Sequence, residues 1–80
     1  MTSADFQLLL RRRPFIPFRV VTTDGTCYEV RHPELVMVGL GSIIIGYPAS
    51  GQSGVYERAD IVSLRHVIRL EPEGEPAASG

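Results

Sequence analysis

The chain has 80 residues, a mass of 8.8 kDa and a formal net charge of −1. A chain this short buries only about 60% of the surface that its unfolded form exposes, so we expect one small domain. Hydrophobic residues make up 44% and charged residues 21% of the sequence, which excludes collagen-like, coiled-coil and wholly disordered chains.

A short helix is expected at the start of the chain. The segment Thr2-Ser3-Ala4-Asp5 has the spacing of a capping box, and Phe6 and Leu10 then fall on one face of a helix. We expect Arg11–Arg13 in its last turn, where their charge complements the helix dipole, and Pro14 after its end. Because so short a helix is marginal alone, its apolar face must pack against the rest of the domain.

A β-hairpin is expected next. Residues Phe15 to Thr23 are mostly β-branched or aromatic and alternate between two faces, which predicts a strand. Asp24-Gly25, the strongest short hairpin signal, follows this strand. The alternation resumes from Cys27 to Arg31, so the second strand of the hairpin is expected there.

The middle of the chain is apolar on both strand faces. Leu35–Val38 and Ser42–Tyr47 flank Gly39-Leu40-Gly41, which indicates a second hairpin or one bent strand around a glycine-rich turn. Two-sided apolar strands favour a closed barrel or a subunit interface. They expose more apolar surface than one small barrel can bury inside, so we expect a homo-oligomer.

Two further strands are expected at Val55–Val62 and Val67–Leu70. The residues between them either continue the alternation or form one 3₁₀ turn at Ser63-Leu64-Arg65-His66. Both interpretations place Leu64 and Ile68 inside the core.

The C-terminal segment has too little apolar content to pack, so we expect residues 72–80 to form a disordered acidic tail and residues 1–71 to form the domain. One helix followed by about five short strands predicts a mainly β fold. Tight turns in so few residues fit a small five-stranded SH3-like barrel better than a sandwich, which typically takes about 100 residues.

Several short motifs resemble the bacterial Sm-like RNA chaperones of the Hfq family, and they occur in the same order: Leu10-Arg11-Arg12-Arg13, Pro17, Asp24-Gly25 and Leu64-Arg65-His66-Val67-Ile68. The resemblance spans roughly residues 4–71. It implies an Sm-like barrel that forms a homo-oligomeric ring and binds single-stranded RNA. By the same resemblance, Arg65 and His66 line the ring pore, and Arg11, Arg12 and Arg13 form a basic rim. The family's Phe-Asp-x-Phe segment, which supplies a base-contacting glutamine, is missing here, so uridine-specific binding is not implied.

The residues leave simpler interpretations open. Arginine suits phosphate contact, but Arg11–Arg13 can instead complement the helix dipole, and His66 can be a half-buried, hydrogen-bonded side chain. Two functions follow from these alternatives. The first is an Sm-like homo-oligomer that contacts single-stranded RNA. The second is a protein–protein interaction or assembly module without nucleic-acid binding, whose strand edges or Ile43–Ile45 face meets a protein partner.

Catalytic and metal-binding patterns are weak. Asp24, Cys27, His32 and His66 could supply a nucleophile, a base and an orienting group, but their spacing matches no catalytic signature. One cysteine and two distant histidines are too few for a metal site or an internal disulfide. We therefore expect no enzyme, no metal and no cofactor.

The location of the protein is predicted from its N-terminus and its apolar runs. Asp5 stands where a signal peptide carries basic residues, so a cytoplasmic location is expected. The longest apolar run, Ile43–Ile45, is far shorter than the roughly 18 residues of a membrane span, so we expect a soluble protein without a membrane partner.

Overall fold

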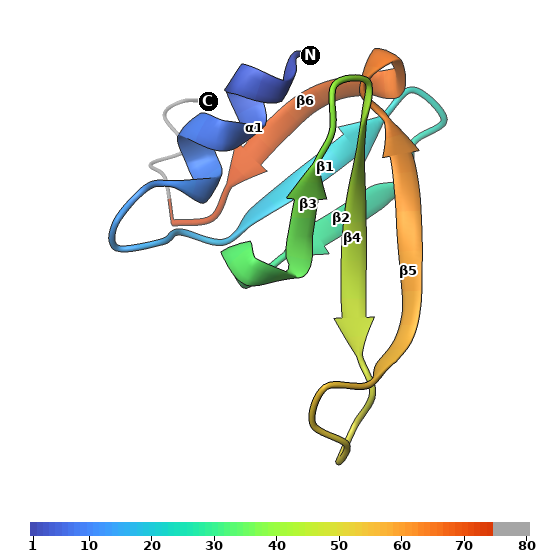
Figure 1. Ribbon diagram of the computed structural model, residues 1–80. Coiled ribbons are helices and arrows are strands. Elements are labelled where there is room, and N and C mark those ends of the chain that lie inside the picture. Colours follow the sequence, from blue (N-terminus) through green and yellow to red (C-terminus); the bar gives the residue numbers. More distant parts are fainter. Residues whose placement is uncertain (75–80) are drawn as a thin grey trace.

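The computed structural model describes residues 1–74, which contain one helix, six strands and two short 3₁₀ turns (Figure 1). In chain order these are α1 (Ser3–Leu10), β1 (Phe18–Thr22), β2 (Cys27–Val30), η1 (Pro33–Leu35), β3 (Val36–Val38), β4 (Ser42–Pro48), β5 (Tyr56–Ser63), η2 (Leu64–His66) and β6 (Val67–Pro72). The expectation of a mainly β fold with an N-terminal helix is confirmed. The strands number six in this part of the chain, where five were expected.

The strands form two antiparallel sheets, with the orders β2-β1-β6 and β3-β4-β5. The second hairpin is confirmed, because β3 and β4 pair on either side of the glycine-rich turn. The chain passes between the sheets at η1 and η2, so a 3₁₀ turn, and not one continuous bent strand, makes each corner. Within the described strands, no hydrogen-bonded pair joins the two sheets, and the predicted barrel is therefore not closed.

The helix begins as its capping box predicts. The Thr2 backbone N–H donates to the Asp5 carboxylate at 2.9 Å, and this bond lowers the pKa of that carboxyl group. The helix ends at Leu10, so Arg11–Arg13 follow the last turn and do not form it as expected. The Arg13 guanidinium donates to the Leu10 carbonyl at 3.0 Å, which satisfies one of the carbonyls that a helix end leaves unpaired.

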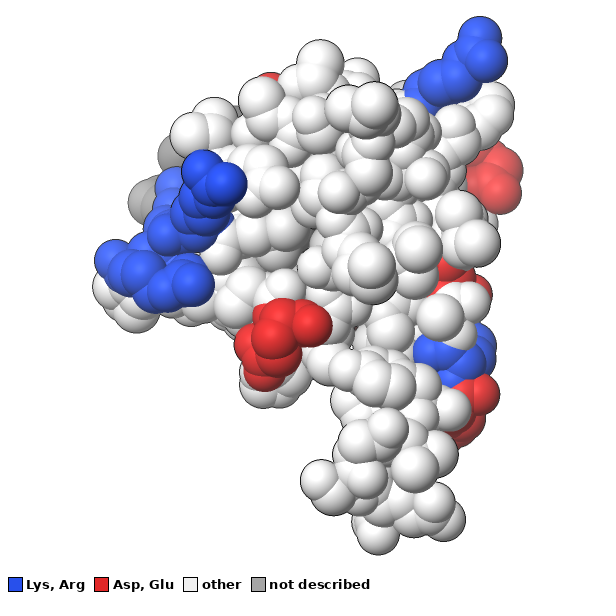
Figure 2. All heavy atoms as spheres, in the orientation of Figure 1, with Lys and Arg blue, Asp and Glu red and all other residues white. Residues whose placement is uncertain are grey.

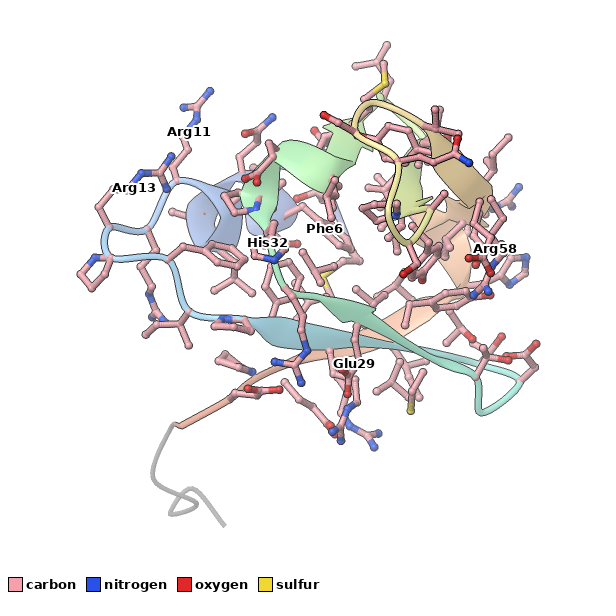
Figure 3. The ribbon with its side chains drawn as sticks, turned by 90° about the horizontal axis from the view of Figure 1, so that it is seen from below. Phe6, Arg11, Arg13, Glu29, His32 and Arg58 are labelled. Atoms are coloured by element: carbon pink, nitrogen blue, oxygen red, sulfur yellow. The ribbon has the colours of Figure 1, made fainter. Side chains whose placement is uncertain are left out.

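The core lies between the two sheets and under α1. Phe6 is fully buried, and its ring centroid lies 6.2 Å from that of Phe18 on β1 (Figure 3). Ile43 and Ile45 of β4 are also buried and reach the same cluster from the other sheet. Leu10, the other buried residue of α1, belongs to the same cluster, so α1 and both sheets contribute to one core.

The 3₁₀ alternative is the correct one for the segment before the last strand. Leu64 opens η2 and is buried, as expected, but Ile68 is 51% exposed. The placement of Ile68 in the core was wrong, because the tight turn breaks the two-residue period of the alternation. Val67 is the buried residue of β6, and Leu70 packs against the core while partly exposed.

The described chain continues past the predicted domain boundary at residue 71. Strand β6 ends at Pro72, which pairs with Phe18, and the Glu73 backbone N–H donates to the Pro17 carbonyl at 2.8 Å. The Glu73 carboxylate lies 3.1 Å from the Arg31 guanidinium. The rest of the predicted tail, residues 75–80, lies outside the described residues.

The Asp24-Gly25 turn joins β1 and β2 as expected. Gly25 has a φ of 87°, a conformation that glycine adopts without a side-chain clash. The Asp24 carboxylate accepts bonds from the Thr22 hydroxyl at 2.5 Å and from the Thr26 N–H at 3.0 Å. These bonds, the one from Thr22 above all, lower the pKa of Asp24 to about 2.

This turn predicts a pH dependence of stability. Since the pKa of Asp24 falls on folding from 3.8 to about 2, its contribution is present above pH 4 and is lost as the pH falls towards 2. Asp24→Asn removes that titration, so the Tm of the variant should fall less than the wild-type Tm between pH 4 and pH 2. Glu57→Gln, at an exposed position of β5, is the control. An equal fall of Tm between pH 4 and pH 2 for Asp24→Asn and the wild type would contradict this assignment.

Candidate interaction surfaces

The arginine run after α1 is one of the two predicted RNA-binding groups. Arg11, Arg12 and Arg13 are all exposed, and Figure 3 shows Arg11 pointing away from the core. Arg11 and Arg13 line a shallow hollow together with Glu34 of η1. Arg13 also binds the end of the helix, which agrees with the structural role left open for the run. Contact between the run and RNA stays a prediction.

Arg65 and His66 form the other predicted group, and both lie in η2. The His66 carbonyl accepts a bond of 2.8 Å from the Thr23 N–H, which holds η2 beside the β1–β2 turn. The His66 side chain is exposed, so its interpretation as a half-buried histidine was wrong. Figure 1 shows η2 at the far end of the sheets from the C-terminal end of α1. A single copy of the chain therefore does not bring the two basic groups together.

Paired charges cover the outer face of the β2-β1-β6 sheet. Arg19 lies in register between Glu29 and Glu71, at 3.6 Å from each carboxylate. Arg69 donates to Glu71, and this bond lowers the pKa of that carboxyl group. Arg31 lies 3.1 Å from Glu29. Exposed pairs of this kind add little stability, but they neutralise the charge of this sheet face.

The outer face of the β3-β4-β5 sheet is apolar in comparison. Met37, Ile44 and Ile61 stand in register across the three strands, and Met37 and Ile61 are 68% and 73% exposed. The ring of Tyr56 lies against Gly46, where a Cβ atom would approach it within 2.6 Å. We call Met37, Ile44, Ile61 and Tyr56 the apolar face. In Figure 2 the surface over β3 and β4 is mostly uncharged, and the arginines lie at its margins.

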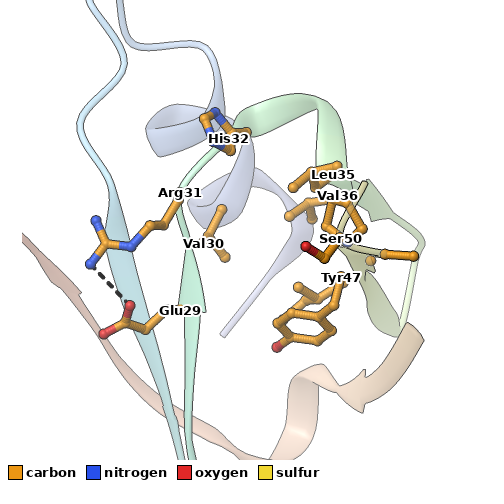
Figure 4. A pocket seen from close by; sticks show the side chains of 12 residues that line it. Glu29, Val30, Arg31, His32, Leu35, Val36, Tyr47 and Ser50 are labelled. Atoms are coloured by element: carbon orange, nitrogen blue, oxygen red, sulfur yellow. Dashed lines mark ion pairs between the residues drawn. The ribbon is translucent and has the colours of Figure 1, made fainter. Parts of the chain in front are cut away.

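A groove between β2 and the end of β4 is the site that the sequence did not predict. It has a volume of about 570 Å³, with apolar walls that include Val30, Leu35, Val36 and Ile45, and Ser50 at its rim (Figure 4). We call it the β2–β4 groove. The only sequence signal for it is the interruption of the strand pattern at His32-Pro33, where the chain leaves β2 and begins η1.

Tyr47 places a polar group in the β2–β4 groove. The Arg58 guanidinium lies over its ring, 4.2 Å from the centroid, and 3.3 Å from the Asp60 carboxylate. Burial, and then the Asp60 charge, raise the pKa of Tyr47. The phenol is therefore a neutral hydrogen-bond donor at physiological pH.

The residues weighed for catalysis or metal binding do not form a metal cluster. Cys27, Asp24, His32 and His66 are all exposed. Within residues 1–74 there is no group of three His, Cys, Asp or Glu side chains that could hold a metal ion. The same part of the chain contains no helix that is long and apolar enough to cross a membrane.

Comparisons with protein-family models, with curated proteins and with solved structures find no match for this chain. They neither support nor oppose the resemblance to the Sm-like family. The surfaces described above therefore carry the functional argument.

Proposed function

We propose that the chain is a non-enzymatic assembly module, in which the two sheets belong to a small SH3-like or Sm-like barrel and the apolar face binds another copy of the chain. The observation that carries this proposal is the row of Met37, Ile44 and Ile61, which crosses three strands without a charged side chain and in which Met37 and Ile61 are exposed and Ile44 is partly buried. Contiguous exposed apolar side chains of this kind mark interaction sites.

The edges of the sheets supply a second reason for self-association. β5 and β6 are edge strands of different sheets, and each exposes an isoleucine, Ile61 and Ile68. An exposed strand edge is a template for pairing with another chain. Two unlike edges on one molecule permit head-to-tail contacts between copies. Such contacts form a closed ring if the rotations between successive copies add up to a full turn. A domain this small also gains stability from oligomerisation.

Sedimentation velocity tests the proposal. Wild-type protein at micromolar concentration is expected to sediment as an oligomer, and Ile61→Glu should give the monomer, because the association would bury a charge. Leu8→Glu is the matched control, since Leu8 is also 73% exposed but lies on α1. A monomeric wild type, or an equal effect of both variants, would refute assembly through the apolar face.

Binding of single-stranded RNA is the second candidate function, and one observation favours it. Arg19, Arg31, Arg58 and Arg69 each pair with a carboxylate, whereas Arg65 has no carboxylate partner within residues 1–74. An arginine without a carboxylate partner can bind a phosphate group without first breaking an ion pair. Assembly would place η2 of several copies around one axis and would supply the concentration of charge that a single copy lacks.

The RNA candidate predicts a salt-dependent and residue-specific affinity. A mixed-sequence single-stranded oligonucleotide should bind at about 50 mM salt and should lose most of its affinity at about 200 mM, because binding releases counterions. Arg65→Gln should weaken this binding in a fluorescence anisotropy titration. Arg69→Gln removes an arginine that is already paired with Glu71 and should have less effect. If the wild type does not bind at the lower salt, this candidate is lost and the assembly module stands.

A further inference from the structure

The β2–β4 groove lies beside a strand edge that has no partner in the described chain. β2 pairs only with β1, and β3 begins after η1 in the other sheet. The Thr22 N–H donates to the Thr26 carbonyl, which sets the hydrogen-bonded pairs of the hairpin. Hydrogen-bonded and non-hydrogen-bonded residue pairs alternate along antiparallel strands. The backbone N–H and C=O groups of Tyr28 and Val30 therefore point to β1, and those of Glu29 point away from β1, to the free edge.

The groove runs along this edge and presents apolar surface to it. Glu29 and Val30 line one side of the groove, and Ile45 and Tyr47 line the other side. Its volume of about 570 Å³ falls in the range of sites that enclose a ligand group of moderate size. An apolar side chain can therefore enter the groove while the backbone that carries it lies along β2.

The rim of the groove carries little uncompensated charge. Glu29 and Arg31 pair at 3.1 Å (Figure 4), and the Glu73 carboxylate lies at the same distance from the Arg31 guanidinium. A strongly charged ligand would compete with these pairs, whereas an uncharged ligand leaves them intact.

We propose that the β2–β4 groove binds an extended, uncharged peptide segment of a partner protein, which adds a strand to the edge of β2 and places one large apolar side chain in the groove. Backbone hydrogen bonds to the strand edge supply general affinity in this mode of binding, and the pocket supplies selectivity for the side chain. The groove is distinct from the apolar face, so this site does not depend on self-association.

Amide-resolved NMR titration tests the proposal with four blocked peptides of the form acetyl-Thr-Val-X-Val-Thr-amide, in which X is Phe, Leu, Tyr or Trp. At least one peptide should give saturable shifts of the Glu29, Arg31 and Tyr47 amides below about 1 mM. The amide of Glu29 should also exchange more slowly with solvent when the peptide is bound. Alanine at X, or N-methylation of the valine that follows X, should weaken binding at least tenfold.

A pair of variants localises the effect. Ser50→Trp places a large side chain at the rim of the groove, and Ser53→Trp makes the same change in the same loop outside its lining. Both positions are exposed, so neither variant disturbs the core. Binding should be lost with Ser50→Trp and retained with Ser53→Trp. The proposal is overturned if none of the four peptides binds by about 1 mM, if the bound peptide shifts other amides only, or if both variants bind alike.

Discussion

Phe6→Ala should leave much of the protein unfolded at 25 °C. Phe6 is fully buried and packs beside Phe18, in the core cluster that α1 shares with both sheets. Truncating a buried phenylalanine costs about 3–5 kcal/mol, because the loss of apolar burial adds to the cost of a cavity. That loss approaches the lower end of the roughly 5–15 kcal/mol by which native domains are stable.

Urea denaturation followed by circular dichroism measures this effect, with Leu8→Ala as the control. Leu8 lies on the same helix but is 73% exposed, so its truncation should change the free energy of unfolding by no more than about 0.5 kcal/mol. Similar urea midpoints for the two variants would mean that α1 does not dock on the sheets.

Local signals in the sequence were sufficient for most of the elements. The capping box at Thr2, the Asp24-Gly25 turn and the glycine-rich turn before Ser42 each depend on residues close together in the chain. Their geometry is set by side chains and backbone angles within a few positions. For this reason the helix start and both hairpins could be predicted from the sequence alone.

The pairing of strands that are distant in the sequence depends on contacts between distant residues, and the sequence alone did not predict it. Phe18 pairs with Pro72, more than fifty positions along the chain, and no local pattern encodes that register. The five-stranded count was wrong for the same reason, and closure of the two sheets into one barrel is not seen in the described strands. Strand number and closure follow from how η1 and η2 turn the chain between the sheets.

The candidate sites also divide into those that local sequence patterns predict and those that depend on contacts between distant residues. The two-sided apolar pattern around Ile44 predicted an exposed apolar surface, and the apolar face agrees with it. Residues of β2, η1, β3 and β4 line the β2–β4 groove, so no single segment of the sequence predicts it. The basic residues could be named from the sequence, but only the structure shows that Arg69 is paired with Glu71 and that Arg65 lies in η2.

Leu64→Ala and Ile68→Ala separate the structure from the alternating pattern of the sequence. The pattern places both side chains in the core and predicts the same loss for each. In the structure Leu64 is buried and Ile68 is 51% exposed. Leu64→Ala should therefore lower the free energy of unfolding by about 2–5 kcal/mol. Ile68→Ala should lower it by less than about 1 kcal/mol in the monomer, since its side chain is already half in water.

The measurement is urea denaturation of both variants in the Ile61→Glu background, so that self-association does not contribute to stability. Equal losses of unfolding free energy for the two variants in this background would mean that Ile68 faces the core. The alternation of inward and outward side chains would then continue through η2 without interruption. Repeating the experiment without Ile61→Glu then tests the edge of β6. An Ile68→Ala loss that grows with protein concentration would place Ile68 in the contact between copies, because stability linked to association depends on concentration.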